Sequence, residues 1–224
     1  MGIALWSIFA INLSLFLKVI TGIKPLPLRM ARNFWSPVIL ACAGGKLKVK
    51  GIENVDPTKS YLVVSNHQSF LDIAALFRAI PVNLHFIGKE ELKKMPFIGW
   101  FMKSMGMVFV DRSDRRKSLI SLKKAAELIQ GGKSVLIFPE GTRSKTGEIR
   151  MFKKGGFFIA QQSDVNLLPV NISGANKVWP YKGINFKPGV VTLTVGEPFK
   201  YSDLEVNDLA EFADKVRKKV IDLG

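Results

Sequence analysis

The feature that most limits the fold of this chain is a short apolar run that leads through a polar turn into a second apolar segment. Residues 61–64 (Tyr-Leu-Val-Val) have the composition of a buried β-strand, and residues 73–77 begin a helix. A turn between such elements lies at the end of a strand, where side chains reach a cleft rather than the core. His67 lies in this turn, and Asp72 follows five residues later on the first turn of the helix.

This spacing makes His67 and Asp72 a candidate pair. If the turn folds back, the carboxylate of Asp72 can accept a hydrogen bond from one imidazole nitrogen of His67. That bond would fix the tautomer and leave the other nitrogen free to act as a base. The alternative is a loop histidine followed by an aspartate that caps the helix, and spacing alone does not separate the two.

The chain has only two histidines, so a histidine base has few candidates. His85 lies inside another predicted strand, residues 84–87. A buried, hydrogen-bonded structural role is the better interpretation for it.

Further apolar runs alternate with helical segments along the chain. Strands are predicted at residues 84–87, 107–110, 134–138, 167–172 and 190–195, and helices at 113–131 and after Asn207. This alternation predicts an α/β fold with a mixed, largely parallel sheet flanked by helices. Polar residues follow several of these strands and should meet at one edge of the sheet, where open α/β sheets bind ligands. They are His67, Lys89, Arg112 and the segment from Glu140 to Arg143.

Length and charge limit the class of protein. A chain of 224 residues builds one sizeable core, so one catalytic domain with short additions is expected. The net charge of +15 indicates an anionic partner such as nucleic acid, an anionic membrane or an acidic protein or substrate. One cysteine and two histidines are too few for an internal disulfide or a typical zinc site, so no metal is expected.

The N-terminal region has a different composition. Residues 2–17 are uncharged and mostly apolar. A helix of that length spans about 24 Å, whereas a bilayer core of about 30 Å requires roughly 20 helical residues. A turn with Pro25 and Pro27 follows, and a second apolar segment occupies residues 30–43. We therefore expect residues 1–43 to form a two-helix hairpin that enters one leaflet, and residues 44–224 to form the catalytic domain. The alternative is that both helices pack on the domain as core.

One internal segment is strongly apolar as well. Residues 96–102 (Pro-Phe-Ile-Gly-Trp-Phe-Met) contain three aromatic side chains and a methionine. Three placements are compatible with this composition: the wall of an acyl-chain cavity, the membrane surface and ordinary core.

Four segments resemble the sequence blocks of the glycerolipid acyltransferases, the family with the His-x-x-x-x-Asp motif. They occur in the family's order over about half of the chain, and the third block is specific. The segments are residues 66–72 (Asn-His-Gln-Ser-Phe-Leu-Asp), 106–112 (Gly-Met-Val-Phe-Val-Asp-Arg), 138–144 (Phe-Pro-Glu-Gly-Thr-Arg-Ser) and 168–172 (Leu-Pro-Val-Asn-Ile).

The resemblance, which is strongest to bacterial members, implies a reaction. It is the transfer of a fatty acyl group from a thioester of acyl carrier protein or coenzyme A to the sn-2 hydroxyl of 1-acyl-glycerol 3-phosphate (lysophosphatidic acid), which gives phosphatidic acid. The alternative acceptors are glycerol 3-phosphate and another lysophospholipid. No further cofactor is implied, and the expected location is the cytoplasmic face of the cytoplasmic (inner) membrane, among anionic lipids.

The reaction needs a base, an anion site and room for a long chain. His67 would take the proton of the acceptor hydroxyl, and Asp72 would orient it. By resemblance, Arg112 and residues 140–143 (Glu140, Gly141, Thr142 and Arg143) bind the phosphoglycerol group, with Lys89 behind them. The alternatives are a solvated surface lysine for Lys89 and a structural ion pair for Glu140.

Two other classes compete with an acyltransferase. A nucleic-acid binder would explain the positive charge, but the aromatic residues cluster in apolar runs and no nucleic-acid motif is present, so no nucleic-acid partner is expected. A lipid-binding or hydrolytic protein could share the fold. The absence of a Gly-x-Ser-x-Gly segment weakens a covalent serine mechanism.

Overall fold

The computed structural model describes residues 2–111, 113–183 and 185–224. Arg112, which the sequence predicts to bind phosphate, lies outside the described residues.

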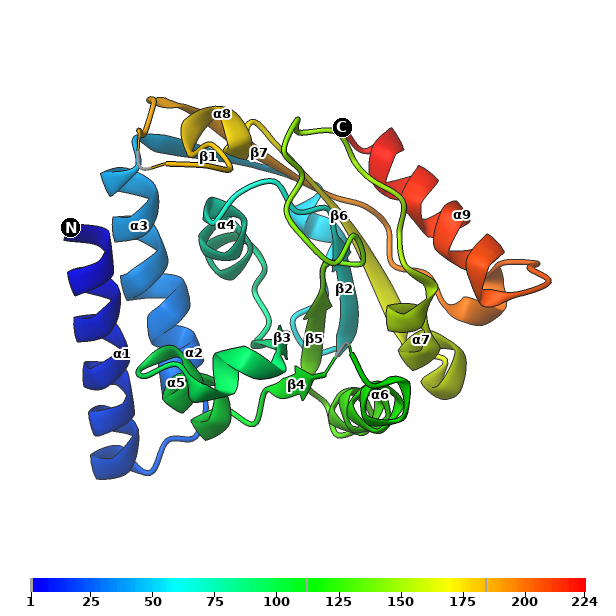
Figure 1. Ribbon diagram of the computed structural model, residues 1–224, viewed down its shortest axis with the longest axis horizontal. Helices are drawn as coiled ribbons and strands as arrows, with labels where there is room; N and C mark the ends of the chain where they lie inside the picture. Colours follow the sequence, from blue (N-terminus) through cyan, green and yellow to red (C-terminus); the bar gives the residue numbers. More distant parts are fainter. Residues whose placement is uncertain (1, 112, 184) are drawn as a thin grey trace.

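The described chain is organised around a seven-stranded sheet with the order β1-β7-β6-β2-β5-β3-β4 (Figure 1). Five neighbouring strands, from β6 to β4, are parallel; β7 runs antiparallel to β6, and β1 pairs parallel with β7. The prediction of a mixed, largely parallel sheet is therefore confirmed. The strands are β1 Gly45–Lys50, β2 Tyr61–Ser65, β3 Leu84–Lys89, β4 Val108–Val110, β5 Ser134–Ile137, β6 Asn166–Ser173 and β7 Gly189–Val195.

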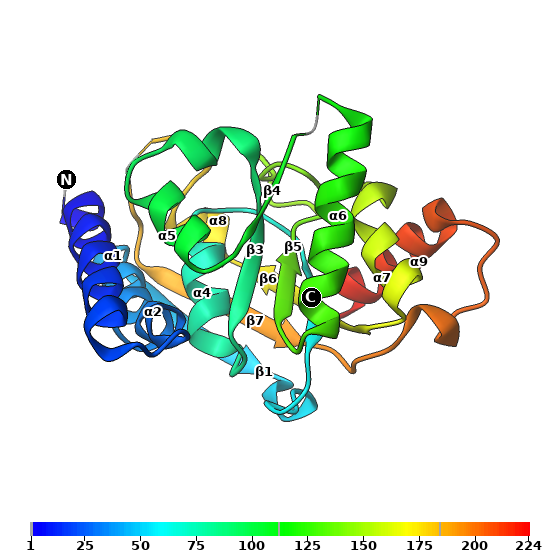
Figure 2. The same cartoon turned by 90° about the horizontal axis from the view of Figure 1, so that it is seen from below.

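Helices cover both faces of the sheet (Figures 1 and 2). In Figure 1, α4 and the N-terminal helices lie on the left side of the central strands, and α6, α7 and α9 lie on the right. The α-helices are α1 Gly2–Thr21, α2 Leu26–Met30, α3 Ser36–Cys42, α4 Leu71–Ala79, α5 Ile98–Ser104, α6 Arg115–Gln130, α7 Phe158–Ser163, α8 Ala175–Val178 and α9 Leu209–Asp222. A π-helical turn, Ala31–Trp35, joins α2 to α3, and 3-10 turns occur at Ile52–Asn54, Glu90–Lys94 (η3), Lys154–Phe157 and Tyr201–Asp203.

The central strands β2 and β5 are buried along their whole length. This explains why both are continuous apolar runs without polar alternation. Their side chains divide between two apolar clusters, one on each face of the sheet: Val63 and Leu136 belong to the cluster under α4, and Leu62 and Val135 to the cluster under α6 and α9. Because both strands are packed on both faces, the loops that follow them begin from fixed positions.

The N-terminal region forms the expected hairpin, but its first helix is longer than predicted. We expected a helix over residues 2–17, whereas α1 has 20 residues and ends before Gly22, whose φ is +68°. Lys18 does not end the helix, because its ammonium group bonds to the carbonyl and hydroxyl oxygens of Ser104 at 2.6 and 2.7 Å. Among the described residues, α1 is the one helix long and apolar enough to cross a membrane, and only 11% of its apolar window is buried inside the structure.

The two arms of the hairpin differ in their packing. The second arm buries Leu28, Ile39 and Leu40 in the core, whereas α1 exposes an apolar stripe. That stripe consists of Leu5, Ile8, Phe9, Phe16, Val19 and Ile20. The alternative in which both helices serve as ordinary core therefore describes the second arm and not the first.

Arg32 ties the second arm to α4. Its Nε donates to the carbonyl of Phe77 at 3.3 Å, and a terminal nitrogen donates to the carbonyl of Val82. The carbonyl of Phe77 lies in the last turn of α4, where helix carbonyls lack partners and a cation is favoured, and Val82 lies in the loop that follows this helix. The hairpin is thus bonded to the helix whose first turn carries Asp72.

Candidate active site

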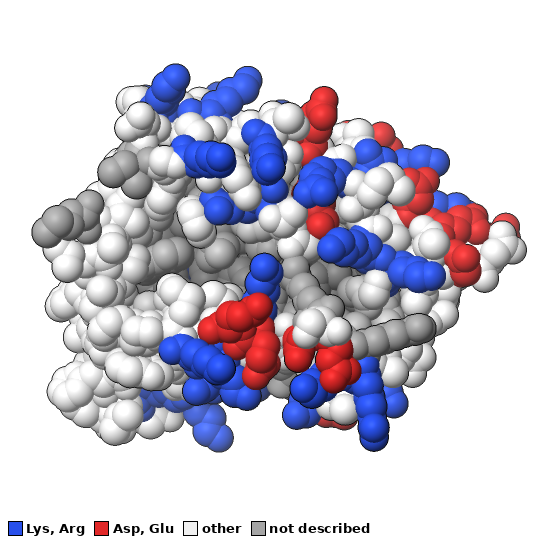
Figure 3. Space-filling model, viewed as in Figure 1, with Lys and Arg blue, Asp and Glu red and all other residues white. Residues whose placement is uncertain are grey.

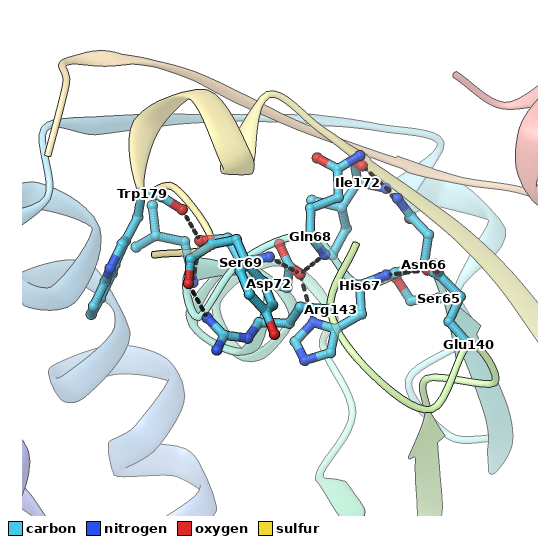
Figure 4. Close-up of polar contacts among 12 residues, drawn as sticks. Ser65, Asn66, His67, Gln68, Ser69, Asp72, Glu140, Arg143, Ile172 and Trp179 are labelled. Atoms are coloured by element: carbon cyan, nitrogen blue, oxygen red, sulfur yellow. Dashed lines mark hydrogen bonds and ion pairs between the residues drawn. The ribbon is translucent and has the colours of Figure 1, made fainter. Parts of the chain in front are cut away.

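The predicted pair His67 and Asp72 is brought together at the carboxyl end of β2 (Figure 4). The Nδ1 atom of His67 lies 2.7 Å from Oδ2 of Asp72. The same oxygen accepts the backbone N–H groups of Gln68 at 2.6 Å and Ser69 at 2.8 Å. Asp72 is fully buried, and a buried carboxylate needs such donors to offset its lost hydration. Because Nδ1 faces a carboxylate, Nε2 is the nitrogen left to meet a substrate.

The backbone of His67 is held from the other side by the loop that follows β5. Its N–H donates to Oε1 of Glu140 at 2.7 Å, and its carbonyl accepts the N–H of Ser144, also at 2.7 Å. The second carboxylate oxygen of Glu140 accepts the N–H of Arg150 at 3.1 Å. Both oxygens of Glu140 therefore bond to main-chain groups, and this residue fixes the position from which the imidazole projects.

Burial raises the pKa of Glu140 above its ordinary value near 4.5, and the hydrogen bonds from His67 and Arg150 act in the opposite direction. The side chain is only 2% exposed. An ion pair was the alternative interpretation for this residue. The hydrogen bonds recorded for its carboxylate come instead from backbone N–H groups of the described chain.

The imidazole of His67 stacks on the ring of Phe138, with centroids 4.0 Å apart and planes 14° apart. Phe138 directly follows β5, so a rigid neighbouring strand supports the histidine ring. The sequence places Phe138 in the third block but does not indicate that it contacts His67. The contact between Phe138 and His67 follows from the strand order, in which β2 and β5 are adjacent.

Two polar side chains pin the loop between β2 and α4. Asn66 donates to the carbonyl of Ile172 and accepts its N–H, both at 2.8 Å, so its amide pairs with β6 as a strand residue would. The hydroxyl of Ser69 donates to the carbonyl of Trp179 at 2.8 Å. The sequence places Asn66 and Ser69 in the first block, but its pattern does not predict these hydrogen bonds. Their bonds hold the loop against segments more than 100 residues further along the chain.

Arg143 is the cationic side chain that the structure places in this site most clearly. Its guanidinium lies over the ring of Phe70, 3.8 Å from the centroid, and 4.8 Å from that of Tyr181. A nitrogen also reaches the carbonyl of Tyr181 at 3.5 Å. Figure 4 shows this guanidinium in the same part of the site as the imidazole of His67. The stacked aromatic rings hold the guanidinium group in place and leave its N–H edge to bind an anion.

Three further predicted residues that the structure describes, Lys89, Gly141 and Thr142, lie at the same edge of the sheet. Lys89 is the last residue of β3 and is exposed; Gly141 follows Glu140 with a φ of +78°, and Thr142 is exposed.

His85 is buried, with Nδ1 near the carbonyls of Asn83 at 3.1 Å and Ser134 at 3.3 Å. Burial and the neighbouring charge of Lys133 lower its pKa, which agrees with the structural role predicted for it. No group of three or more potential metal ligands occurs among the described residues.

The geometry defines a class of enzyme. A histidine whose Nδ1 is fixed by a buried carboxylate is suited to take a proton from a hydroxyl group at Nε2. In a transferase of this kind, the hydroxyl group is that of a bound substrate. A stacked arginine beside the histidine suits a substrate that carries an anion.

Comparison with known proteins identifies the family. The acyltransferase family model matches residues 46–173, which is more than half of the chain, and the chain belongs to this family. A 1-acyl-sn-glycerol-3-phosphate acyltransferase of Saccharomyces cerevisiae is 39% identical over 196 residues, covering 86% of this chain and 64% of the yeast protein. The alpha form of the enzyme from Mus musculus is 31% identical over 180 residues, covering 80% of this chain and 63% of its own length. The chain therefore spans just under two thirds of these relatives.

A solved structure is also similar. The crystal structure of the 1-acyl-sn-glycerophosphate (LPA) acyltransferase PlsC from Thermotoga maritima matches with a TM-score of 0.78 and 29% identity. The match covers 96% of this chain and 87% of that one. The resemblance first indicated by the four sequence blocks thus extends to almost the whole described fold.

The raised pKa of Glu140 predicts a pH-dependent contribution to stability. Because burial raises the pKa, the folded chain holds this proton more tightly than the unfolded chain, and stability falls as pH rises from about 4.5 through the raised value. The Glu140→Gln variant lacks this group. The free energy of unfolding of the wild type minus that of the variant should therefore decrease as pH rises through this window and then level off.

Urea unfolding over a pH series measures this difference. Glu127→Gln, which removes an exposed carboxylate of α6, is the matched control and should show no such decrease. A difference that increases with pH would mean that the hydrogen bonds to Glu140 outweigh its burial, contrary to this assignment.

Proposed function

We propose that this chain transfers a fatty acyl group from an acyl thioester to the sn-2 hydroxyl of 1-acyl-glycerol 3-phosphate and so forms phosphatidic acid. The observation that carries the proposal is the 2.7 Å contact between His67 and a buried Asp72, beside the stacked guanidinium of Arg143. The names of the relatives from yeast and mouse support the same acceptor.

The proposed mechanism follows from this geometry. Nε2 of His67 takes the proton of the acceptor hydroxyl as that oxygen attacks the thioester carbonyl. The tetrahedral intermediate collapses with cleavage of the carbon–sulfur bond, and the imidazolium returns the proton to the leaving thiolate. Asp72 stabilises the imidazolium and keeps Nε2 directed at the substrate. No acyl-enzyme forms, because the substrate hydroxyl does what serine does in a hydrolase.

The acceptor phosphate is assigned to the cationic side chains at the sheet edge. Arg143 is held over two rings, and Lys89 ends a neighbouring strand. Arg112 keeps the role that the family resemblance implies. Thr142 and the backbone near Gly141 are assigned to the glycerol portion. Glu140 acts through the backbone of His67 rather than on the substrate, since both of its oxygens accept main-chain N–H groups.

We assign the protein to the cytoplasmic face of the cytoplasmic membrane, held in one leaflet by the hairpin. The exposed apolar stripe of α1 supports this assignment. In Figure 3 the left part of the surface, over α1, carries few charged groups, whereas lysines and arginines gather over the upper part. Basic residues near an anionic leaflet each gain about 1 kcal/mol. The donor is proposed to be an acyl carrier protein or coenzyme A thioester.

The first prediction concerns the base. His67→Ala should abolish transfer, and Asp72→Asn should lower kcat by roughly 10² to 10⁴, because the amide no longer selects the reactive tautomer. The measurement is phosphatidic acid formation from labelled lysophosphatidic acid in mixed micelles. His85→Gln is the control and should retain activity. A folded His67→Ala protein with wild-type activity would rule out this mechanism.

The second prediction concerns the anion site. Arg143→Ala should lower kcat/KM for lysophosphatidic acid about 10- to 100-fold, as expected for loss of a charge-assisted contact, while the KM for the donor changes little. Arg116→Ala, which removes an exposed guanidinium of α6, is the control. An effect confined to the donor would contradict the assignment. Assays with glycerol 3-phosphate and with uncharged lysolipids separate the acceptor classes.

The third prediction concerns the hairpin. In a Cys42→Ser background, Lys24→Cys should react with a membrane-impermeant maleimide from the side of the vesicle that carries the catalytic domain. Placing the exposed side chains of Lys24 and Arg29 at the headgroups avoids about 2.5 to 3.5 kcal/mol for each charge at the bilayer centre. Lys187→Cys reports the side of the catalytic domain. Reaction of Lys24→Cys only from the opposite side would mean that α1 crosses the bilayer.

A further inference from the structure

The turn before α5 has an unusual backbone. Phe97 has φ +62° and ψ −64°, and the N–H of Ile98 donates to the carbonyl of Pro96 at 2.7 Å. This combination is a γ-turn of the rare, strained type. A strained turn persists only where the surrounding structure fixes it, and such turns occur at functional positions.

Close packing fixes this turn. A Cβ atom on Gly99 would lie 2.7 Å from the carbonyl oxygen of Leu92 and 2.8 Å from that of Lys93, so only glycine lets α5 approach η3 this closely. Met102 packs α5 onto β3, where its Cε would lie 2.6 Å from a Cβ on Gly88. These contacts with η3 and β3 hold the turn in a fixed position relative to the sheet.

The strained turn directs large apolar side chains into solvent. Met95 is 45% exposed, Ile98 42% and Trp100 51%, and the ring of Phe97 packs edge-on against Trp100 at 5.1 Å. Exposed apolar side chains that cluster in this way mark an interaction surface. We call Met95, Ile98 and Trp100 the α5 cluster.

The helix that carries the α5 cluster adjoins α1 at its last residue. The ammonium of Lys18 bonds to Ser104, the last residue of α5, and Figures 1 and 2 both show α5 near the lower end of α1. At that end α1 exposes Phe16, Val19 and Ile20. The two apolar surfaces therefore belong to neighbouring elements joined by a hydrogen bond.

Charges surround the α5 cluster but do not interrupt it. Lys93 and Glu90 pair at 3.2 Å, Glu91 is exposed at the start of η3, and Lys94 and Lys103 are exposed on either side of the turn. No charged residue occurs from Met95 to Phe101. Tryptophan with flanking lysines is the composition of a segment that rests at a lipid interface.

We propose that the α5 cluster is a second membrane contact, which enters the interfacial region of the same anionic leaflet as α1. This inference rests on the proposed membrane role of the hairpin and extends it. One helix leaves the domain free to rotate about the helix axis. A second, rigid contact at α5 fixes how the sheet edge with His67 faces the leaflet.

Binding to vesicles tests this directly. The full chain is mixed with vesicles of equal parts phosphatidylcholine and phosphatidylglycerol, and the bound fraction is measured by co-sedimentation. Trp100→Asp should weaken binding about 10-fold or more, since one interfacial apolar side chain is replaced by a charge. Met95→Asp should act in the same direction. Leu119→Asp, at an exposed apolar position of α6 that is 40% exposed, is the matched control and should bind as the wild type does.

Activity with a short-chain, soluble lysophosphatidic acid distinguishes the alternatives. Trp100→Asp should keep its activity on that acceptor and lose activity on acceptor embedded in vesicles. Unchanged vesicle binding by Trp100→Asp and Met95→Asp, with binding lost by Phe16→Asp, would overturn the second contact and leave the hairpin in place. Loss of activity on the soluble acceptor with binding intact would also overturn it, and would assign the cluster to the acyl-chain site. Vesicle binding does not depend on turnover, so a chain without transferase activity would refute the proposed function separately.

Discussion

The site depends on one buried carboxylate oxygen. Oδ2 of Asp72 bonds to the imidazole of His67 and to two consecutive backbone N–H groups, those of Gln68 and Ser69. A carboxylate with no solvent exposure loses its hydration, and these three donors offset that loss only if the loop keeps its shape. The electrostatic requirement that stabilises the turn is therefore the same requirement that orients the histidine. A change that frees the loop therefore also removes the hydrogen bond that selects one tautomer of His67.

A second buried carboxylate acts on the same residue from the opposite side. Glu140 bonds to the backbone N–H of His67, and Ser144 bonds to its carbonyl. Asp72 thus fixes the ring and Glu140 fixes the main chain that carries it. Asp72 lies in the first turn of α4, which follows β2, and Glu140 lies in the loop that follows β5; β2 and β5 are neighbouring parallel strands. This juxtaposition gives a physical reason why the first and third sequence blocks occur together.

The sequence predicted the parts of this arrangement that depend on local pattern. Continuous apolar runs indicated the buried strands. The spacing of His67 and Asp72 made them a candidate pair, and the resemblance of the four blocks to the family favoured that interpretation. The role of Glu140 was not predictable in the same way, because its partner is a main-chain N–H 73 residues away and backbone groups leave no signature in sequence. The stacking of Phe138 depends on strand order, which alternating elements do not specify. The end of α1 was predicted too early because Lys18 was assigned to the segment that follows the helix. In the structure Lys18 lies within α1, and its ammonium group donates a hydrogen bond to the carbonyl oxygen of Ser104, which is distant in sequence.

The structure connects three features that the proposed acyl transfer requires. The base lies at the carboxyl edge of the parallel strands, the stacked Arg143 lies beside it, and the exposed stripe of α1 belongs to a hairpin that Arg32 bonds to α4. Because α4 carries Asp72 in its first turn and the carbonyl of Phe77 in its last turn accepts a hydrogen bond from Arg32, the hairpin and the His67–Asp72 pair are joined through one helix. In the proposed membrane-bound protein, this connection would set the position of the base relative to lipid.

The central claim is that Asp72 holds His67 with its proton on Nδ1 and a free electron pair on Nε2. Nitrogen-15 NMR of the protein labelled only at histidine measures this directly, since the chain has two histidines and His85→Gln assigns the signals. If Asp72 holds the ring in this way, neutral His67 is protonated at Nδ1, and Asp72→Asn changes the tautomer. A neutral His67 that carries its proton on Nε2 in the wild type would contradict the proposed role of Asp72.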